Sequence, residues 1–170
     1  MIGKMIFAID PGNIESAYVL LGDKMQVLGK GKLPNSEVEK ELLRAIKIPH
    51  VEVVCERINS YGMAVGREVF DTCEQIGRFS FICDMYHIKM NYINRSEEKL
   101  TICHSPRAND ASIRRALIDR FAQHDLKNGK GTKKDPDWFY GFKADIWAAF
   151  AVGFTYAEKR KEERNYAEQK

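Results

Sequence analysis

The chain has 170 residues, of which 44% are hydrophobic and 30% are charged, and its formal net charge is +3. This size suits one domain with its own core, and the composition is ordinary for a globular protein. No apolar stretch reaches the roughly eighteen residues that span a bilayer, so we expect no role at a membrane. Because the net charge is small, any binding of nucleic acid must come from local clusters of basic residues.

The chain has four cysteines, and none of them belongs to a CxxC pair. Their apolar or strand-like surroundings favour reduced thiols over a disulfide framework or a zinc site. The N-terminus also lacks the layout of a secretory signal peptide. Together these features predict a cytoplasmic protein.

The first predicted element is a strand over residues 5–9, whose apolar run, MIFAI, is typical of a strand covered on both faces. Asp10 follows the run directly, and Pro11-Gly12 ends the strand. A carboxylate at the mouth of a buried strand costs free energy unless it is hydrogen-bonded or bound to a cation. The segment alone also allows a simple turn aspartate, because Asp-Pro-Gly is a good turn sequence.

Two more strands are predicted over residues 16–21 and 25–33, so a three-stranded meander opens the domain. A helix is predicted to follow over residues 36–48. Glu39 stands three residues after Ser36, which indicates a capping box at the start of this helix.

A fourth strand is predicted over residues 51–55, and it ends in Glu56. This repeats the layout of the first strand and Asp10, in which a carboxylate terminates an apolar run. A long amphipathic helix is then predicted over residues 63–83, followed by a fifth strand over 86–93.

The rest of the chain is predicted to be mainly helical, apart from one polar loop. Asn109 or Asp110 is the expected N-cap of a helix that follows the fifth strand. Residues 123–137 hold four lysines and two glycines, and we expect them to be the least ordered internal segment. The last helix is expected to begin near Phe142, with Asp145 in its first turn and small residues that let it pack closely on the sheet.

This order of elements predicts an α/β fold with a five-stranded mixed sheet, made of a three-stranded meander plus parallel strands and flanked by helices. We expect one domain over residues 1–158. The charged run 159–170 is expected to be a frayed helix end.

Three carboxylates are candidates for one site. A right-handed crossover can make the first and fourth strands parallel neighbours, which would bring Asp10 and Glu56 to the same edge of the sheet. Asp145 would lie at the rim of a packed helix. Oxygen ligands without nearby histidines favour Mg²⁺ or Mn²⁺, and two such ions can promote hydrolysis of a phosphodiester.

Each of these acids also has a structural explanation. Glu56 can pair with Arg57 or with a lysine at the strand end. Asp145 can simply favour the positive end of its helix dipole.

Four segments, in the same order, resemble the RuvC-type Holliday-junction resolvases, and in particular their phage-encoded relatives: IFAIDPG, VEVVCERI, ANDASIRRAL and GFKADIWAAFAVGFTYAE. The resemblance spans residues 5–158. It implies an RNase H-like nuclease domain, a homodimer and divalent-metal cleavage of branched DNA.

Carried over by position, the resemblance implies that Asp10, Glu56 and Asp145 are the metal ligands. The family commonly has a fourth acid, or a histidine, three residues before the last aspartate, where this chain has Phe142. The fourth ligand is therefore missing or displaced. Asp110 is a substitute candidate by composition alone, although aspartate is also a strongly preferred helix cap.

The family also places lysines near its site and often an aromatic wedge shortly after the glutamate. Lys99 falls where one lysine is expected, whereas Asp110 falls about where a second would be. The matching place for the wedge is around Asn59, with Tyr61 nearby. These departures bear on junction selectivity more than on cleavage.

Basic residues would have to hold the phosphates of a DNA strand, which they do without reading its sequence. The segment LKNGKGTKK is the most suggestive, because its glycines let the lysines follow a phosphate path, although a solvated surface charge is the alternative for each residue. The candidates are Arg57, Lys99, Arg107, Lys127, Lys130, Lys133 and Lys134.

The leading hypothesis is a structure-selective endonuclease for branched DNA, such as Holliday junctions or forks, acting as a homodimer because symmetric cuts need paired sites. One alternative is a non-catalytic module that binds branched DNA, since the fourth acid is absent. Another is an ATP-handling domain of the sugar-kinase or actin-like type, which also begins with an Asp-x-Gly strand but uses two similar halves. If a phage encodes the protein, we expect it in the cytoplasm of the host cell.

Overall fold

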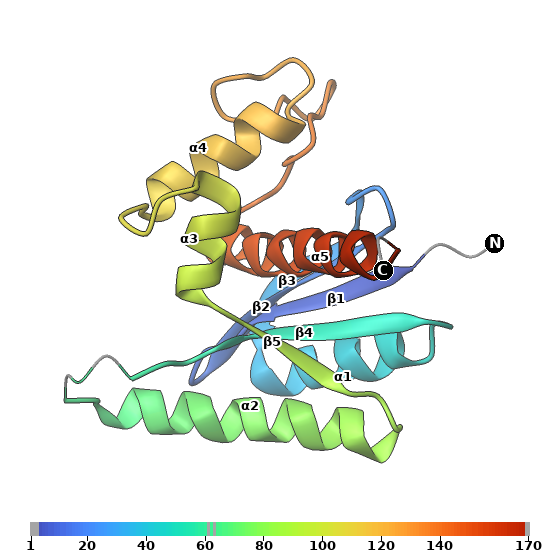
Figure 1. Cartoon of the computed structure of the whole chain (residues 1–170), viewed down its shortest axis with the longest axis vertical. Helices are drawn as coiled ribbons and strands as arrows, with labels where there is room; N and C mark the ends of the chain where they lie inside the picture. The colour runs from blue at the N-terminus through green and yellow to red at the C-terminus, as the bar shows by residue number, and fades with distance from the viewer. Residues whose placement is uncertain (1–3, 61, 63, 169–170) are drawn as a thin grey trace.

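A five-stranded sheet of order β3-β2-β1-β4-β5 lies at the centre of the computed structural model, which describes residues 4–60, 62 and 64–168 (Figure 1). The first three strands form an antiparallel meander, while β4 runs parallel to both β1 and β5. The predicted mixed sheet is therefore confirmed. The strands are β1 Met5–Asp10, β2 Glu15–Leu21, β3 Val27–Pro34, β4 Val51–Arg57 and β5 Met90–Asn94.

Helices cover both faces of this sheet (Figure 1). Two of them pack below it in the view and one, α5, lies across its other face, with α3 and α4 beyond. The helices are α1 Asn35–Ile46, α2 Arg67–Met85, α3 Arg95–Cys103, α4 Asp110–Phe121 and α5 Ile146–Glu168.

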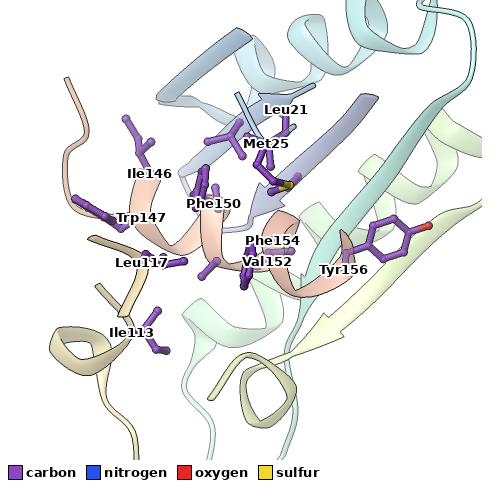
Figure 2. Close-up of a cluster of buried hydrophobic side chains, with 14 of the residues drawn as sticks. Leu21, Met25, Ile113, Leu117, Ile146, Trp147, Phe150, Val152, Phe154 and Tyr156 are labelled. Atoms are coloured by element: carbon purple, nitrogen blue, oxygen red, sulfur yellow. The ribbon is translucent and has the colours of Figure 1, made fainter. Parts of the chain in front are cut away.

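Strand β1 is buried on both faces, as its apolar run predicts. Phe7 and Ile9 belong to the core shared with α1 and α2, whereas Ile6 and Ala8 belong to the core under α5. The second of these cores is the aromatic one, in which Trp147 and Phe150 of α5 meet residues of β2 and α4 (Figure 2). By the same alternation, the side chain that follows Ala8 by two residues, Asp10, belongs to the α5 face.

Helix α5 approaches the sheet closely at Gly153. A Cβ atom added there would lie 2.7 Å from Leu21 Cδ1 and 3.0 Å from Ala8 Cβ. The expectation that small residues allow this helix to pack tightly is therefore confirmed. The contact also fixes the height of α5 above the end of β1.

Several predicted boundaries are wrong. Helix α5 begins at Ile146, not near Phe142, because Gly141 adopts a φ of +76° and Phe142 is buried in the aromatic core before the helix starts. Asp145 consequently lies just before the helix, and its carbonyl accepts a hydrogen bond from the N–H of Ala149 at 3.0 Å. The chain also turns at His87, with a φ of +57°, so β5 begins only at Met90.

The predicted capping box of α1 does not form. The N-cap of α1 is Pro34, which makes no side-chain capping bond, and Glu39 instead pairs with Arg78 of α2 at 2.7 Å. The expected start of α2 at Met63 lies outside the described residues, and the helix begins at Arg67.

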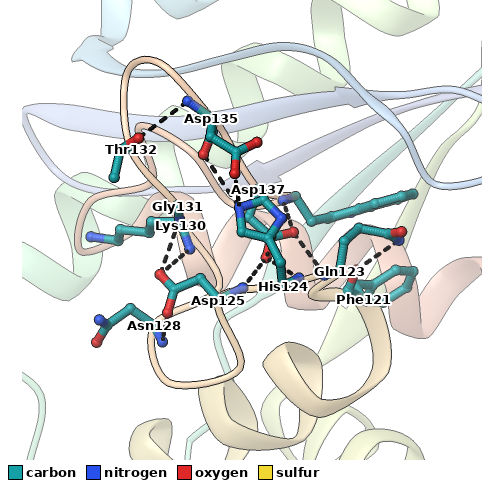
Figure 3. A network of polar contacts seen from close by, with 11 residues as sticks. Phe121, Gln123, His124, Asp125, Asn128, Lys130, Gly131, Thr132, Asp135 and Asp137 are labelled. Atoms are coloured by element: carbon teal, nitrogen blue, oxygen red, sulfur yellow. Dashed lines mark hydrogen bonds and ion pairs between the residues drawn. The ribbon is translucent and has the colours of Figure 1, made fainter.

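The segment between α4 and α5 is more ordered than its composition predicts (Figure 3). The buried carboxylate of Asp137 accepts the backbone N–H groups of Gln123, His124, Asp125 and Trp138 at 2.7–2.9 Å. Burial alone would raise the pKa of Asp137, but these four donors outweigh it and hold the pKa below the usual range. These hydrogen bonds within residues 123–138 therefore hold the loop in one conformation.

The charged end of the chain continues as part of α5 as far as Glu168. Lys159 pairs with Glu97 of α3, and Arg160 pairs with Glu52 of β4 at 3.0 Å, so this turn of the helix contacts the rest of the fold. None of the helices in the described part of the chain combines the length and hydropathy of a membrane span.

We expect Gly153→Val to lower the free energy of unfolding by about 1–3 kcal/mol, because the added methyl groups overpack the contact with the sheet. Gly29→Ala is the matched control, since a Cβ there would lie at an ordinary 3.7 Å from Leu20 Cβ. Urea unfolding of the two variants checks this. A Gly153→Val protein as stable as wild type would contradict the packing described above.

Candidate active site

Two carboxylates meet at the carboxyl ends of β1 and β4. The parallel register pairs Ile9 with Cys55, so the next residues along each strand, Asp10 and Glu56, lie side by side. Their side chains share a hydrogen bond. The convergence expected from the two strand ends is therefore present in the structure.

The electrostatics of this pair are unfavourable when both groups are ionised. Burial, followed by the hydrogen bond and the charge of Glu56, raises the pKa of Asp10 to about 9. Asp145 and Glu98 add smaller effects in the same direction. Two carboxylates in contact need either a shared proton or a cation between them.

The pair opens into a cavity of about 470 Å³. Asp145, just before α5, and Asp110, the first residue of α4, line the same cavity. One oxygen of Asp145 forms an ion pair of 2.5 Å with Lys32 on β3. The N-cap of α4 is Asn109, whose side chain accepts the N–H of Ser112, so the alternative in which Asp110 caps the helix is wrong.

Cations also line this acidic cavity. Arg95, the first residue of α3, and Arg114 of α4 both face it, and Trp147 contributes its ring to the wall. The guanidinium of Arg95 pairs with Glu98 at 2.7 Å and also with Asp110. The cavity therefore combines acids from the strand ends and the helix starts with two arginines from α3 and α4.

Glu98 is a buried acid that the sequence interpretation missed. Its side chain is completely buried, one oxygen holds Arg95, and the other has no hydrogen-bond partner among the described residues. Burial and the charge of Glu56 raise the pKa of Glu98 to about 8. The sequence did contain a signal, because Asn94 and Glu97 form a capping box that marks the start of the helix, and Glu98 stands four residues before the buried Ile102, on the same helix face.

These residue types fit a hard cation, since they offer several carboxylate oxygens and no competing histidine. Across residues 4–60, 62 and 64–168, however, no three His, Cys, Asp or Glu side chains lie close enough together to form a ligand set. The structure therefore brings Asp10, Glu56 and Asp145 to one cavity but only the first two into contact. The second oxygen of Asp145 forms no ion pair or hydrogen bond with another described residue.

The other predicted residues that the structure describes are not among those that line this cavity. Arg57 ends β4 and stacks its guanidinium over the ring of Tyr92 at 5.4 Å. Asn59 is exposed in the segment after β4, and Tyr61 lies outside the described residues, so the wedge stays a prediction. The DNA-binding roles also stay predictions for Lys99 on α3, for Arg107 between α3 and α4, and for Lys127, Lys130, Lys133 and Lys134 in the loop before α5.

The similar solved structures include two of the same protein. No family model matches the chain, and no curated protein matches it. The structure of Thermus thermophilus RuvC in complex with a Holliday junction substrate matches with a TM-score of 0.67 and 12% identity, over 94% of this chain and 96% of that one. A second Thermus thermophilus RuvC structure matches with a TM-score of 0.64 and 14% identity, over the same shares.

At these identities the likeness shows the fold. The chain has the RNase H-like α/β fold, and within it the RuvC-like arrangement of a five-stranded mixed sheet with helices on both faces. The predicted fold class is confirmed.

We expect the stability of the metal-free protein to fall as the pH rises. The folded-state pKa of Asp10, about 9, lies above the value of roughly 4 in the unfolded chain, so the folded state binds the extra proton between these limits. Thermal unfolding in EDTA at about pH 6 and about pH 9 measures this, and Asp10→Asn should flatten the dependence. The control is Asp119→Asn on the exposed side of α4. If the unfolding temperature of Asp10→Asn changed with pH as much as that of wild type, the raised pKa of Asp10 would be contradicted.

Proposed function

We propose that this chain is a structure-selective endonuclease that hydrolyses phosphodiesters of branched DNA with divalent metal ions. One observation carries the proposal: Asp10 and Glu56 are in contact at the ends of neighbouring parallel strands, in a cavity that Asp110 and Asp145 also line. Carboxylates at the carboxyl edge of such a sheet are placed where α/β folds bind ligands. Burying two carboxylates in contact costs free energy, and a bound cation would offset that cost.

Asp10, Glu56 and Asp145 would hold Mg²⁺ or Mn²⁺, and Asp110 is the candidate for a fourth ligand. When bound, two such ions activate a water molecule and stabilise the leaving oxygen of the phosphodiester. Asp145 would have to turn one oxygen from its ion pair with Lys32 toward the pair of acids.

The chain's own cations would hold the substrate. Arg95 and Arg114 line the same cavity as the acids, and a guanidinium can donate two parallel hydrogen bonds to a phosphate. The buried carboxylate of Glu98 holds Arg95 at 2.7 Å and so fixes the direction of its donors. We propose that Arg95 orients the phosphate that is cut.

Branched DNA is the proposed substrate because the similar RuvC structure is a complex with a Holliday junction. The two folds match over 94% of this chain and 96% of that one, which supports carrying the substrate class over as a proposal. A phage origin and action in the host cytoplasm remain part of the proposal, supported by the segments that resemble the phage-encoded relatives.

We propose a homodimer formed through α2. Phe70, Phe81 and Met85 are each more than half exposed and, with Gly77, fall on one stripe of this helix. A Cβ added to Gly77 would meet nothing within 4 Å, so a second helix can approach there. Paired sites would allow symmetric cuts in a junction.

A non-catalytic module that binds branched DNA is the second candidate. The ion pair between Lys32 and Asp145 favours it, because it satisfies the third acid without a metal. The ATP-handling alternative gains no comparable support, since the described residues contain one meander and one sheet.

Asp10→Asn and Glu56→Gln should each lower cleavage of a four-way junction at least about 100-fold, because each removes a charged ligand whose loss costs roughly 3 kcal/mol or more of transition-state stabilisation. Junction affinity should be unchanged or higher, because a negative charge is lost near the phosphate. Gel assays of nicking and of binding, with Glu37→Gln on α1 as the control, test this. Binding without metal-dependent nicking in the wild type would favour the non-catalytic module instead.

Phe81→Glu should convert the dimer into a monomer, because it places a charge in the apolar stripe of α2. Leu28→Glu, the same change at an exposed site on β3, should leave the dimer intact. Sedimentation velocity at micromolar protein distinguishes the two states. A monomeric wild type would contradict symmetric cleavage by a dimer.

A further inference from the structure

A second cavity, of about 260 Å³, opens beside the candidate active site, between α4 and the loop that precedes α5. Arg114, Lys127 and Lys130 line it from two separate segments of the chain. Arg114 and Trp147 line the acidic cavity as well, so the two cavities are contiguous. We call the second one the basic cavity.

The cations of the basic cavity are not neutralised by neighbours. None of the three forms an ion pair with a carboxylate of the described residues, whereas the adjacent Arg115 is paired with Asp119. The guanidinium of Arg114 instead stacks over the ring of Trp147, 5.2 Å from its centroid. The stacking leaves its donors free for an anion.

Asp125 is the one acid of the lining, and its charge is already committed. Its two oxygens accept the backbone N–H groups of Asn128, Lys130 and Gly131 at 3.0–3.1 Å (Figure 3). These donors lower the pKa of Asp125 below its usual value. The carboxylate therefore shapes the loop instead of pairing with the lysines.

The glycines between the lysines fix the loop's path. Gly129 and Gly131 have φ values of +70° and +64°, a region that other residues rarely adopt. A Cβ at Gly129 would lie 2.9 Å from Phe139 Cδ2, and one at Gly131 would lie 2.3 Å from the carbonyl oxygen of Asp135. The backbone that carries Lys127 and Lys130 is thus set before any ligand arrives, which lowers the entropy cost of binding.

We propose that the basic cavity binds a backbone phosphate of the nucleic-acid strand whose neighbouring phosphate lies in the acidic cavity. The inference rests on the proposed function and adds a subsite to it. A guanidinium and two ammonium groups around one hollow match the charge and the several acceptor oxygens of a phosphate. The shared wall formed by Arg114 and Trp147 lets one strand run through both cavities.

Two of the four lysines of the loop belong to this subsite and two do not. Lys127 and Lys130 line the basic cavity, whereas Lys133 and Lys134 are exposed and lie outside its lining. The sequence alone treats the four as equivalent. The pair Lys133 and Lys134 is therefore a matched control, because it carries the same charge on the same loop.

The test compares Lys127→Gln/Lys130→Gln with Lys133→Gln/Lys134→Gln, both in an Asp10→Asn background that prevents cleavage. Fluorescence anisotropy measures the affinity for a four-way DNA junction over a series of NaCl concentrations, and circular dichroism confirms folding. The first pair should weaken binding about 10-fold and reduce the slope of log K against log [NaCl] by roughly 1–2, while the second should change the slope by less than about 0.5.

Equal effects of the two pairs, or no effect of the first, would overturn the subsite and leave the proposed function standing. Failure of the Asp10→Asn parent to bind any junction would overturn the proposed function itself. Inorganic phosphate is the third probe. If it raises the melting temperature of wild type but not of Lys127→Gln/Lys130→Gln, while both bind the junction equally, the cavity takes free phosphate and the strand proposal is wrong.

Discussion

The contact between Asp10 and Glu56 is the constraint on which the rest of the site depends. The fold buries β1 on both faces and sets β4 beside it in parallel register, so the two carboxylates are forced together. Their mutual repulsion must be offset by a proton or a cation. A structural role alone gives no reason to keep such a pair, whereas a site for hard cations gives one.

The charges around this pair indicate how a protein of small net charge could hold the proposed polyanionic substrate. Arg95 and Arg114 line one cavity together with the acids, and Lys127 and Lys130 line the next cavity with Arg114. Asp10 and Glu56 lie at the sheet edge, while Asp110 and Asp145 lie at or just before the starts of helices, and these four cations lie on helices and on a loop. A strand could therefore keep its phosphates on the basic side and present one of them to the acids.

Much of the fold follows from local pattern. The apolar runs that end in Asp10 and Glu56, and the order of strands and crossovers, predict the sheet and the meeting of these two acids. The start of α5 could not be predicted, because it depends on a left-handed Gly141 and on the burial of Phe142 in an aromatic core. Local sequence does not contain that tertiary packing.

The partners of the acids could not be predicted from the sequence either. Lys32 of β3 reaches Asp145, which lies just before α5, and Arg95 of α3 reaches Asp110 of α4. Such contacts join residues that no short-range spacing connects. The ordered conformation of residues 123–137 could not be predicted either. Composition shows the glycines and lysines of this loop but not the hydrogen bonds that Asp125 and Asp137 accept.

The most direct measurement is the anomalous scattering of Mn²⁺ soaked into crystals of the protein. We expect a manganese peak between the carboxylates of Asp10 and Glu56, with an oxygen of Asp145 turned from Lys32 toward it. Manganese bound only at other carboxylates, with the Asp10–Glu56 hydrogen bond intact, would contradict the metal site and with it the nuclease.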